Sequence, residues 1–379
     1  MKTTIRSFVA PVRAAVGWLA VGTVAAFGQI PTTFEDFHLS GTQIGDVPPG
    51  VLETSPTCAA CHGNFDPDHE PYRTWRGSLM GQAGRDPLFF AQMATANQDV
   101  ANAGYFCMRC HVPMSFVTGH AYDPAGDTLD EVDRDGVTCH FCHTMVDPVH
   151  QPGISPPEDV AVLAGLDQVP EFYGNAMFVL DPTGLRRGPY DDPSPLLHPA
   201  IESPFHRSGD LCGTCHDVGN VAVSKQPDGT YRYNEIDQPP PSEDLHALFP
   251  LERTFSEWRL SAFADGGVDM GGLFGGTGPP VVSTCQDCHM PKATAAGCVY
   301  SDPRDDLAVH EFAGASSWVL EIIAEHYAGD PDVDPAALAA GRQKAIEMVQ
   351  RAASLELAQD PGSLRARVIN QSGHKLPTG

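Results

Sequence analysis

The sequence contains five Cys-x-x-Cys-His motifs, whose thiols and imidazoles are its most reactive recurring groups. The chain has 379 residues, 11 cysteines and 16 histidines. Ten cysteines form pairs separated by two residues, and a histidine follows each pair directly. The motif residues are Cys58, Cys61 and His62; Cys107, Cys110 and His111; Cys139, Cys142 and His143; Cys212, Cys215 and His216; and Cys285, Cys288 and His289. Five such placements do not arise by chance, so the histidine belongs to the motif.

This motif is typical of covalent haem attachment. Two thiols three positions apart can add across the two vinyl groups of one haem, and the next residue, histidine, coordinates the iron from the proximal side. A structural zinc site would need four ligands and no histidine after every pair, while a redox dithiol would occur once. Disulfides would leave the histidines unexplained. We therefore expect five haem c groups, with zinc and disulfides as the alternatives.

The first 28 residues have the pattern of a secretory signal peptide. Lys2, Arg6 and Arg13 precede an apolar run that ends in small residues before Gln29. This run is too short to span a bilayer, which needs about 20 apolar residues. We expect cleavage near residue 28 and a periplasmic or extracellular protein without a transmembrane span in the mature chain. An uncleaved membrane anchor is the alternative.

Composition predicts the fold class. The chain has 37 glycines and 34 prolines, and 19% of its residues are charged. We expect a mainly α fold with extensive loops, organised around stacked haems, with the start of a small β segment at the C-terminus. Helices are predicted within 85–101, 251–264 and 332–358, and a strand over 364–370.

Three segments follow from these patterns. Residues 1–28 form the signal peptide, 29–330 a pentahaem cytochrome c domain, and 331–379 a helix plus a strand. Because one strand buries too little surface alone, we expect the last segment to be the start of a truncated β unit. The motifs at 107–111 and 139–143 are expected to place their haems in near contact.

Charge limits the partners. The formal net charge is −25 and becomes −28 without the three basic residues of the signal peptide. Such a charge argues against nucleic acid and anionic lipid surfaces, and it permits a basic redox partner. The expected partners are redox proteins or other multihaem cytochromes.

A series of phrases resembles one known family. "CAACHGN", "TWRGSLMGQAGRDPLF", "YFCMRCHVPM", "DGVTCHFCHTM", "SPFHRSGDLCGTCHDVGN", "EWRLSAF" with "CQDCHMPK", and "GHKLPTG" occur in this order. Together they are similar to multihaem c-type cytochromes related to hydroxylamine oxidoreductase, from about residue 55 to the end. The resemblance implies electron transfer outside the cytoplasm, mostly through six-coordinate haems, in a largely helical fold.

Eleven histidines remain as candidates for the distal side of the irons. The resemblance favours His206, His310 and His374 as distal ligands. His69, His120 and His150 are further candidates, each seven to nine residues after the nearest proximal histidine. His140 lies on the proximal side within its own motif, so we do not expect it to cap its own iron. Met80, Met93 and Met114 are alternatives that would raise the potential.

Two functions fit this sequence. The first is an electron carrier with low-spin haems in contact. The alternative is an oxidoreductase acting on small nitrogen or sulfur compounds at one haem with an open position. The carrier is favoured, because the sequence has no Cys-x-x-Cys-Lys variant and only five haem motifs, where the hydroxylamine-oxidising relatives are expected to have eight. Cys298 has no partner among the remaining cysteines.

Overall fold

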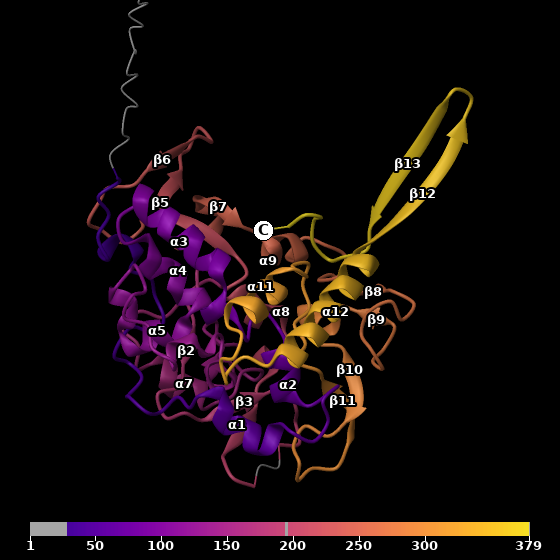
Figure 1. Cartoon of the computed structure of the whole chain (residues 1–379). Helices are drawn as coiled ribbons and strands as arrows, with labels where there is room; N and C mark the ends of the chain where they lie inside the picture. The colour runs from indigo at the N-terminus through magenta and orange to yellow at the C-terminus, as the bar shows by residue number, and fades with distance from the viewer. Residues whose placement is uncertain (1–28, 194–195, 379) are drawn as a thin grey trace, which may run out of the picture.

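The structure is a computed structural model that describes residues 29–193 and 196–378. The predicted signal peptide lies outside the described residues. Within them, helices and short strands alternate along the chain and gather in one body, from which a long hairpin projects (Figure 1).

Twelve α-helices occur in the described part of the chain: α1 (Ser55–His62), α2 (Pro71–Arg76), α3 (Pro87–Asp99), α4 (Ala103–His111), α5 (Pro113–Thr118), α6 (Cys139–His143), α7 (Asp159–Leu163), α8 (Gly209–Gly213), α9 (Thr254–Arg259), α10 (Cys285–His289), α11 (Val319–His326) and α12 (Pro335–Ala352). Short 3-10 turns are η1 (Glu35–Phe37), η2 (Ala83–Arg85), η3 (His120–Tyr122), η4 (Asp133–Asp135), η5 (Pro204–Arg207) and η6 (Leu245–Ala247). Most of these helices are short, so tertiary packing has to stabilise them.

The strands are β1 (Met145–Val146), β2 (Val179–Leu180), β3 (Arg186–Gly188), β4 (Ala200–Glu202), β5 (Val218–Lys225), β6 (Tyr231–Tyr233), β7 (Leu248–Glu252), β8 (Val268–Asp269), β9 (Val281–Val282), β10 (Lys292–Ala295), β11 (Arg304–Ala308), β12 (Ala353–Asp360) and β13 (Ser363–Asn370). They form six small sheets, of which five have two strands and one has the order β6-β5-β7. All pairs are antiparallel except β3 with β4.

The prediction of a mainly α fold is wrong: the described chain is mixed α/β. Most of the strands that we missed lie outside the three predicted helices, in parts of the chain where we expected extensive loops, while β12 begins within the predicted helix 332–358. Most have only two to five residues, which is too short for an alternating pattern to mark them. Such strands form because tertiary packing brings two extended segments together, as with β1 and β2.

Two of the predicted helices are confirmed, and their caps explain where they begin. The Asp86 carboxylate accepts from the Leu88 and Phe89 amides at the start of α3, and Asp334 caps α12 in the same way. However, α12 ends at Ala352, and the residues that we expected to continue it form β12. From the segment 251–264 only α9 is helical.

The predicted strand over 364–370 is confirmed as β13, and its partner is β12. The two strands pair along their whole length, from Ala353 with Asn370 to Asp360 with Ser363, and form the projecting hairpin. The helix α12 before it packs against α2 and α11. The hairpin therefore supplies within this chain the pairing that a lone strand would lack.

The largest apolar cluster is where the motifs are anchored. It contains fully buried side chains from distant segments, such as Met108, Phe116 and Phe178. The partly buried cysteines Cys107, Cys110, Cys142 and Cys215 pack against it. Cys288 packs against a separate cluster that includes Phe274 and Met348.

None of the described helices combines the length and the apolar character that a membrane crossing requires.

Candidate haem-binding site

Each motif lies on or beside a short helix. The motif cysteines and histidine end α1 and α4, make up all of α6 and α10, and begin at the C-terminal end of α8. One helical turn places residues three apart on the same face, so both thiols of a pair point to one side. The following histidine then lies directly beyond them. The local geometry therefore suits two thioether bonds and one proximal nitrogen.

Caps fix where three of these helices start. The Thr138 hydroxyl accepts from the Phe141 amide in α6, and Ser208 accepts from the Asp210 amide in α8. At α10, Thr284 and Asp287 form a reciprocal capping box. Each cap lies within four residues of the first motif cysteine, so it fixes the position of the attachment site.

Thiols of different motifs lie close enough to influence one another. The neighbouring Cys139 thiol lowers the pKa of Cys58, the Cys215 thiol raises that of Cys110, and the Cys212 thiol raises that of Cys285. The motifs therefore form one pair, the first with the third, and one series of the second, fourth and fifth. The expected direct contact between the second and third motifs is not among these thiol contacts.

The motif thiols are partly buried, and their pKa values shift in different directions: the neighbouring Cys139 lowers that of Cys58. Burial raises the pKa of Cys107 to about 11 and that of Cys142 to about 12. A thiol nucleophile or zinc ligand needs the opposite shift, toward the thiolate. In residues 29–193 and 196–378, no motif cysteine belongs to a group of three or more ligand atoms close enough to hold a metal ion. The zinc and dithiol alternatives are therefore not favoured.

Three proximal histidines are oriented in the same way. The Nδ1 atom of His62 is hydrogen-bonded to the Gly297 carbonyl oxygen at 2.6 Å, that of His143 to Arg187 at 2.7 Å, and that of His289 to Ala313 at 2.7 Å. Such a bond fixes the tautomer and directs Nε2 away from the backbone.

A second imidazole faces each of these three rings. The ring centroids are 6.3 Å apart for His62 and His198, 6.2 Å for His143 and His310, and 6.4 Å for His289 and His374. An imidazole nitrogen binds a transition-metal ion at about 2 Å, and the ring centroid lies about 1 Å behind that nitrogen. Two imidazoles that bind one iron from opposite sides would therefore have centroids about 6 Å apart. The three pairs have the spacing that bis-histidine coordination requires.

His143 has two neighbouring imidazoles. The His206 ring stacks at 5.8 Å with its Nε2 atom 3.0 Å from the Cys142 carbonyl oxygen, which places it on the proximal side of the motif. His310 lacks that contact and is the better placed of the two to face the iron. Burial, with His143 adding repulsion, lowers the pKa of both His206 and His310 to about 3. Both rings are therefore neutral, which is the form that binds metal.

Nitrogen atoms of these two rings also lack hydrogen-bond partners. Among the described residues, the buried Nδ1 atoms of His206 and His310 have none. A buried polar atom without a partner is costly, and coordination or a contact with a bound group would offset that cost. The donor set, the ring spacing and these two atoms together fit haem.

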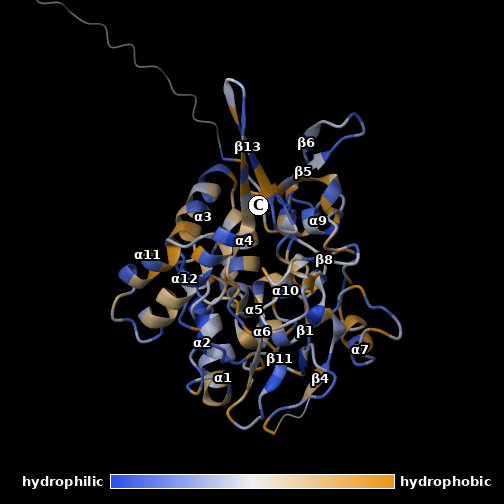
Figure 2. Cartoon of the chain, turned by 90° about the vertical axis from the view of Figure 1, so that its right-hand side faces the viewer, coloured by the Kyte–Doolittle hydropathy of each residue, from blue (hydrophilic) through white to orange (hydrophobic). Residues whose placement is uncertain are grey.

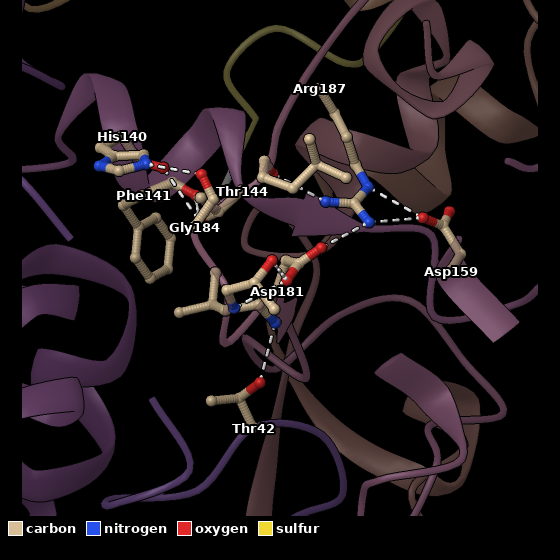
Figure 3. A network of polar contacts seen from close by, with 11 residues as sticks. Thr42, His140, Phe141, Thr144, Asp159, Asp181, Gly184 and Arg187 are labelled. Carbon is tan, nitrogen blue, oxygen red and sulfur yellow. Dashed lines mark hydrogen bonds and ion pairs between the residues drawn. The ribbon is translucent and has the colours of Figure 1, made fainter. Parts of the chain in front are cut away.

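A buried ion network holds the carbonyl group that orients His143 (Figure 3). The Arg187 guanidinium donates from Nε to Asp159 and from Nη2 to Asp181, both at 2.9 Å, and all three side chains are almost fully buried. The Asp181 amide donates to the carbonyl oxygen of Thr144, the residue that ends α6. The network therefore fixes two backbone groups near His143: the Arg187 carbonyl that is bonded to its ring, and the Thr144 carbonyl of the next residue.

The second and fourth motifs are different. His111 stacks on Phe89 with ring centroids 4.2 Å apart, so a phenyl ring covers one face of this imidazole. In the described part of the chain, neither His111 nor His216 has a ring–carbonyl hydrogen bond or an imidazole facing it. The side chain of His216 is exposed, while the surrounding protein atoms and the nearby His289 lower the pKa of its imidazole to about 4.

Aromatic packing positions the fourth motif instead. Gly209 and Gly213 on α8 face Trp258 and Phe255 of α9, and a Cβ atom at Gly213 would lie 2.6 Å from the Phe255 ring. The two glycines therefore allow α9 to pack tightly on this attachment helix.

The other candidate histidines lie away from the proximal rings. His69 pairs with Asp66 at the surface, and His120 pairs with Asp133 at 2.6 Å. His150 is buried at Nε2, and in the described structure that atom has no hydrogen-bond partner. His140 has both nitrogens engaged, with the Glu53 amide and the Gly184 carbonyl. None of these four rings faces a motif histidine, and distal roles for His69, His120 and His150 remain untested predictions.

Sequence reasoning missed His198, which faces His62. His198 lies in a loop outside the sequence phrases that resemble the family. The one feature that marks it is its position just before β4, the strand that pairs with β3. His120, Asp130 and Asp133 also bring ligand atoms within 4.8 Å of one another. Both Asp133 oxygens already accept hydrogen bonds from neighbouring groups, so this cluster is best explained as a stabilised loop.

Comparisons with protein-family models, with curated proteins and with solved structures found no match for this chain.

Proposed function

We propose that this chain is an exported multihaem c-type cytochrome that carries electrons through five covalently attached haems. The observation that supports it most is the spacing of three imidazole pairs, 6.2–6.4 Å between centroids, each containing the histidine of a Cys-x-x-Cys-His motif. Bis-histidine coordination gives low-spin iron of low potential, which is suited to electron relay. The family resemblance of the sequence points to the same role.

The residues divide the work of holding the haems. The ten motif cysteines would each add S–H across one vinyl group, which leaves a thioether and no free thiol. The motif histidines supply the proximal nitrogens, and backbone carbonyls orient three of them. Bound haem supplies a reversible one-electron change at iron, while the apolar clusters around the cysteines exclude water.

The contacts between motifs favour a conduit over isolated sites. Neighbouring thiols that shift each other's pKa link the first motif to the third and the fourth motif to both the second and the fifth. His206 connects the two sets, because its ring contacts the Cys142 carbonyl and its own carbonyl accepts from Gln286 in the fifth motif. Partners at each end would be redox proteins or other multihaem cytochromes outside the cytoplasm.

The test is a count of haems and of their spin states. Mass spectrometry of the exported holoprotein is expected to show five attached haems, and a Cys285→Ala/Cys288→Ala variant should show four. Electron paramagnetic resonance of the oxidised protein should show at least three low-spin centres. A folded, haem-free protein would overturn the proposal.

A second function is favoured by one observation. Within the described residues, His111 and His216 have no imidazole facing them, so their haems would each have an open position. An oxidoreductase acting on small nitrogen or sulfur compounds needs such a position. Turnover of nitrite or hydroxylamine that is lost in His216→Ala but kept in His374→Ala would favour this function over simple electron transfer.

A further inference from the structure

The first motif is flanked by two loops at one edge of the protein. The Gly297 carbonyl accepts from His62, and the Val299 amide donates to the Cys61 carbonyl at 2.8 Å. From the other side, the loop before β4 brings His198 opposite His62. Both loops lie beside α1 at the end of the molecule away from the hairpin (Figure 1).

These loops expose large apolar side chains. Leu196 and Leu197 are 76% and 75% exposed, and Tyr300 and Val299 are 67% and 49% exposed. Each lies within three residues of a group that orients or faces His62. Large apolar side chains that cluster in the open mark interaction sites more often than scattered single ones do.

Side-chain contacts brace the two loops against each other. Arg304 contacts Asp192 at 3.2 Å and Asp306 at 2.6 Å, and its guanidinium lies 3.4 Å from the centroid of the Tyr190 ring. The Tyr190 hydroxyl donates to the Asp306 carbonyl. These contacts hold Tyr190 and Asp192 of the loop before β4 against Arg304 and Asp306 of β11.

The rim of the patch is acidic. Six carboxylates lie on or beside the two loops, and Arg186 and Arg304, the arginines there, are already paired with acidic groups. The carboxylates are Glu53, Asp191, Asp192, Asp302, Asp305 and Asp306. Negative charge around an apolar centre attracts a positively charged surface and speeds its association.

We propose that Leu196, Leu197, Val299 and Tyr300, here called the port patch, form the docking surface for a basic redox protein that exchanges electrons with the haem of the first motif. This inference rests on the proposed function. It goes further by naming one motif as the place of entry or exit and by stating the charge of the partner.

The hairpin β12–β13 provides a matched comparison. Leu355 and Leu357 are 61% and 60% exposed on it, but its charged side chains pair with each other, Arg365 with Asp360 and Arg367 with Glu356. The hairpin therefore has exposed apolar area without the acidic rim.

The experiment measures electron exchange with a lysine-rich monohaem c-type cytochrome by stopped flow. The holoprotein is compared with Leu196→Ser/Leu197→Ser, Tyr300→Ser and the control Leu355→Ser/Leu357→Ser. We expect the second-order rate constant to fall about tenfold in the port-patch variants and by less than about twofold in the control, since a few central residues dominate such interfaces. In Asp302→Asn/Asp305→Asn, the rate at low salt should fall and its dependence on ionic strength should weaken.

Reduction by dithionite should be unchanged in all variants. Port-patch variants that react at the wild-type rate, or a control that slows equally, would overturn the port. A preparation without haem would instead refute the proposed function, so the two failures are distinguishable.

Discussion

The first, third and fifth motifs differ from the second and fourth in two ways that occur together. In the first group each proximal histidine is bonded to a backbone carbonyl and faces a second imidazole. In the described part of the second group, His111 and His216 have neither feature, and aromatic side chains pack around them or their helix instead. The motif histidines of the two sets therefore have different surroundings.

The difference follows from the strands. Arg187 lies in β3, Gly297 lies in the turn between β10 and β11, and Ala313 follows β11. The facing histidines also follow or precede strands: His198 before β4, His310 after β11 and His374 after β13. Helices therefore contain the motif residues. Extended segments contain the carbonyl groups and imidazoles that lie next to three of the motif histidines.

Removal of a facing imidazole should have the largest effect. In His198→Ala and His374→Ala, one low-spin haem should become high-spin in electron paramagnetic resonance, because its iron loses one axial ligand. His69→Ala, which removes a surface ring, serves as the control. Unchanged spectra in both variants would show that the 6 Å pairs are not ligand pairs.

At the third motif, His310→Ala should change the spin state and His206→Ala should not, since the His206 Nε2 atom contacts the backbone of its neighbour's motif. The reverse result would assign the distal role to His206. Either result would sharpen the comparison, because it identifies the ring that completes this site.

Small ligands should separate the two groups of motifs in the wild-type protein. Azide or nitrite is expected to shift the signals of two haems, those of His111 and His216, and to leave three unchanged. Titration followed by optical and paramagnetic spectra measures this. Five haems without any response would mean that the second and fourth motifs are also six-coordinate, and the comparison would fail.

Breaking the buried network beside His143 should destabilise the fold by about 1–3 kcal/mol, because Asp181→Ala removes one of the two buried carboxylates that pair with the Arg187 guanidinium. Chemical denaturation of the holoprotein measures this. Asp192→Ala, which removes an exposed partner of Arg304, should cost less than about 1 kcal/mol. Equal losses in the two variants would show that the network has no special role.

The smallest effect concerns His120. Its hydrogen bond to Asp133 raises the pKa of the imidazole above 6.5, so its stabilisation is complete below that pH and disappears as pH rises through the higher folded-state value. His120→Ala should therefore lose stability at pH 5.5 and lose little at pH 9. The loss should stay below about 1 kcal/mol, because the ring is 37% exposed. A loss that does not change with pH would contradict this account.

The five motifs and the starts of two helices depend on residues that are close together in the chain, so they could be predicted from the sequence. A spacing of three and four residues on one helical turn defines each attachment site wherever the turn lies in the fold, so all five motifs were identified without a structure. The caps Asp86 and Asp334 likewise act within four residues, and both helices begin where they were predicted.

The pairing of each motif histidine with a second imidazole depends on the tertiary structure and could not be predicted from the sequence. His62 with His198 and His143 with His310 are far apart along the chain, and the loops and strands that bring them together are too short to leave a periodic pattern. The same reason explains the missed strands and the end of α12, where pairing with β13 replaced the predicted helix. Local spacing marks the five motifs in the sequence, and packing between distant segments sets the surroundings of each motif histidine.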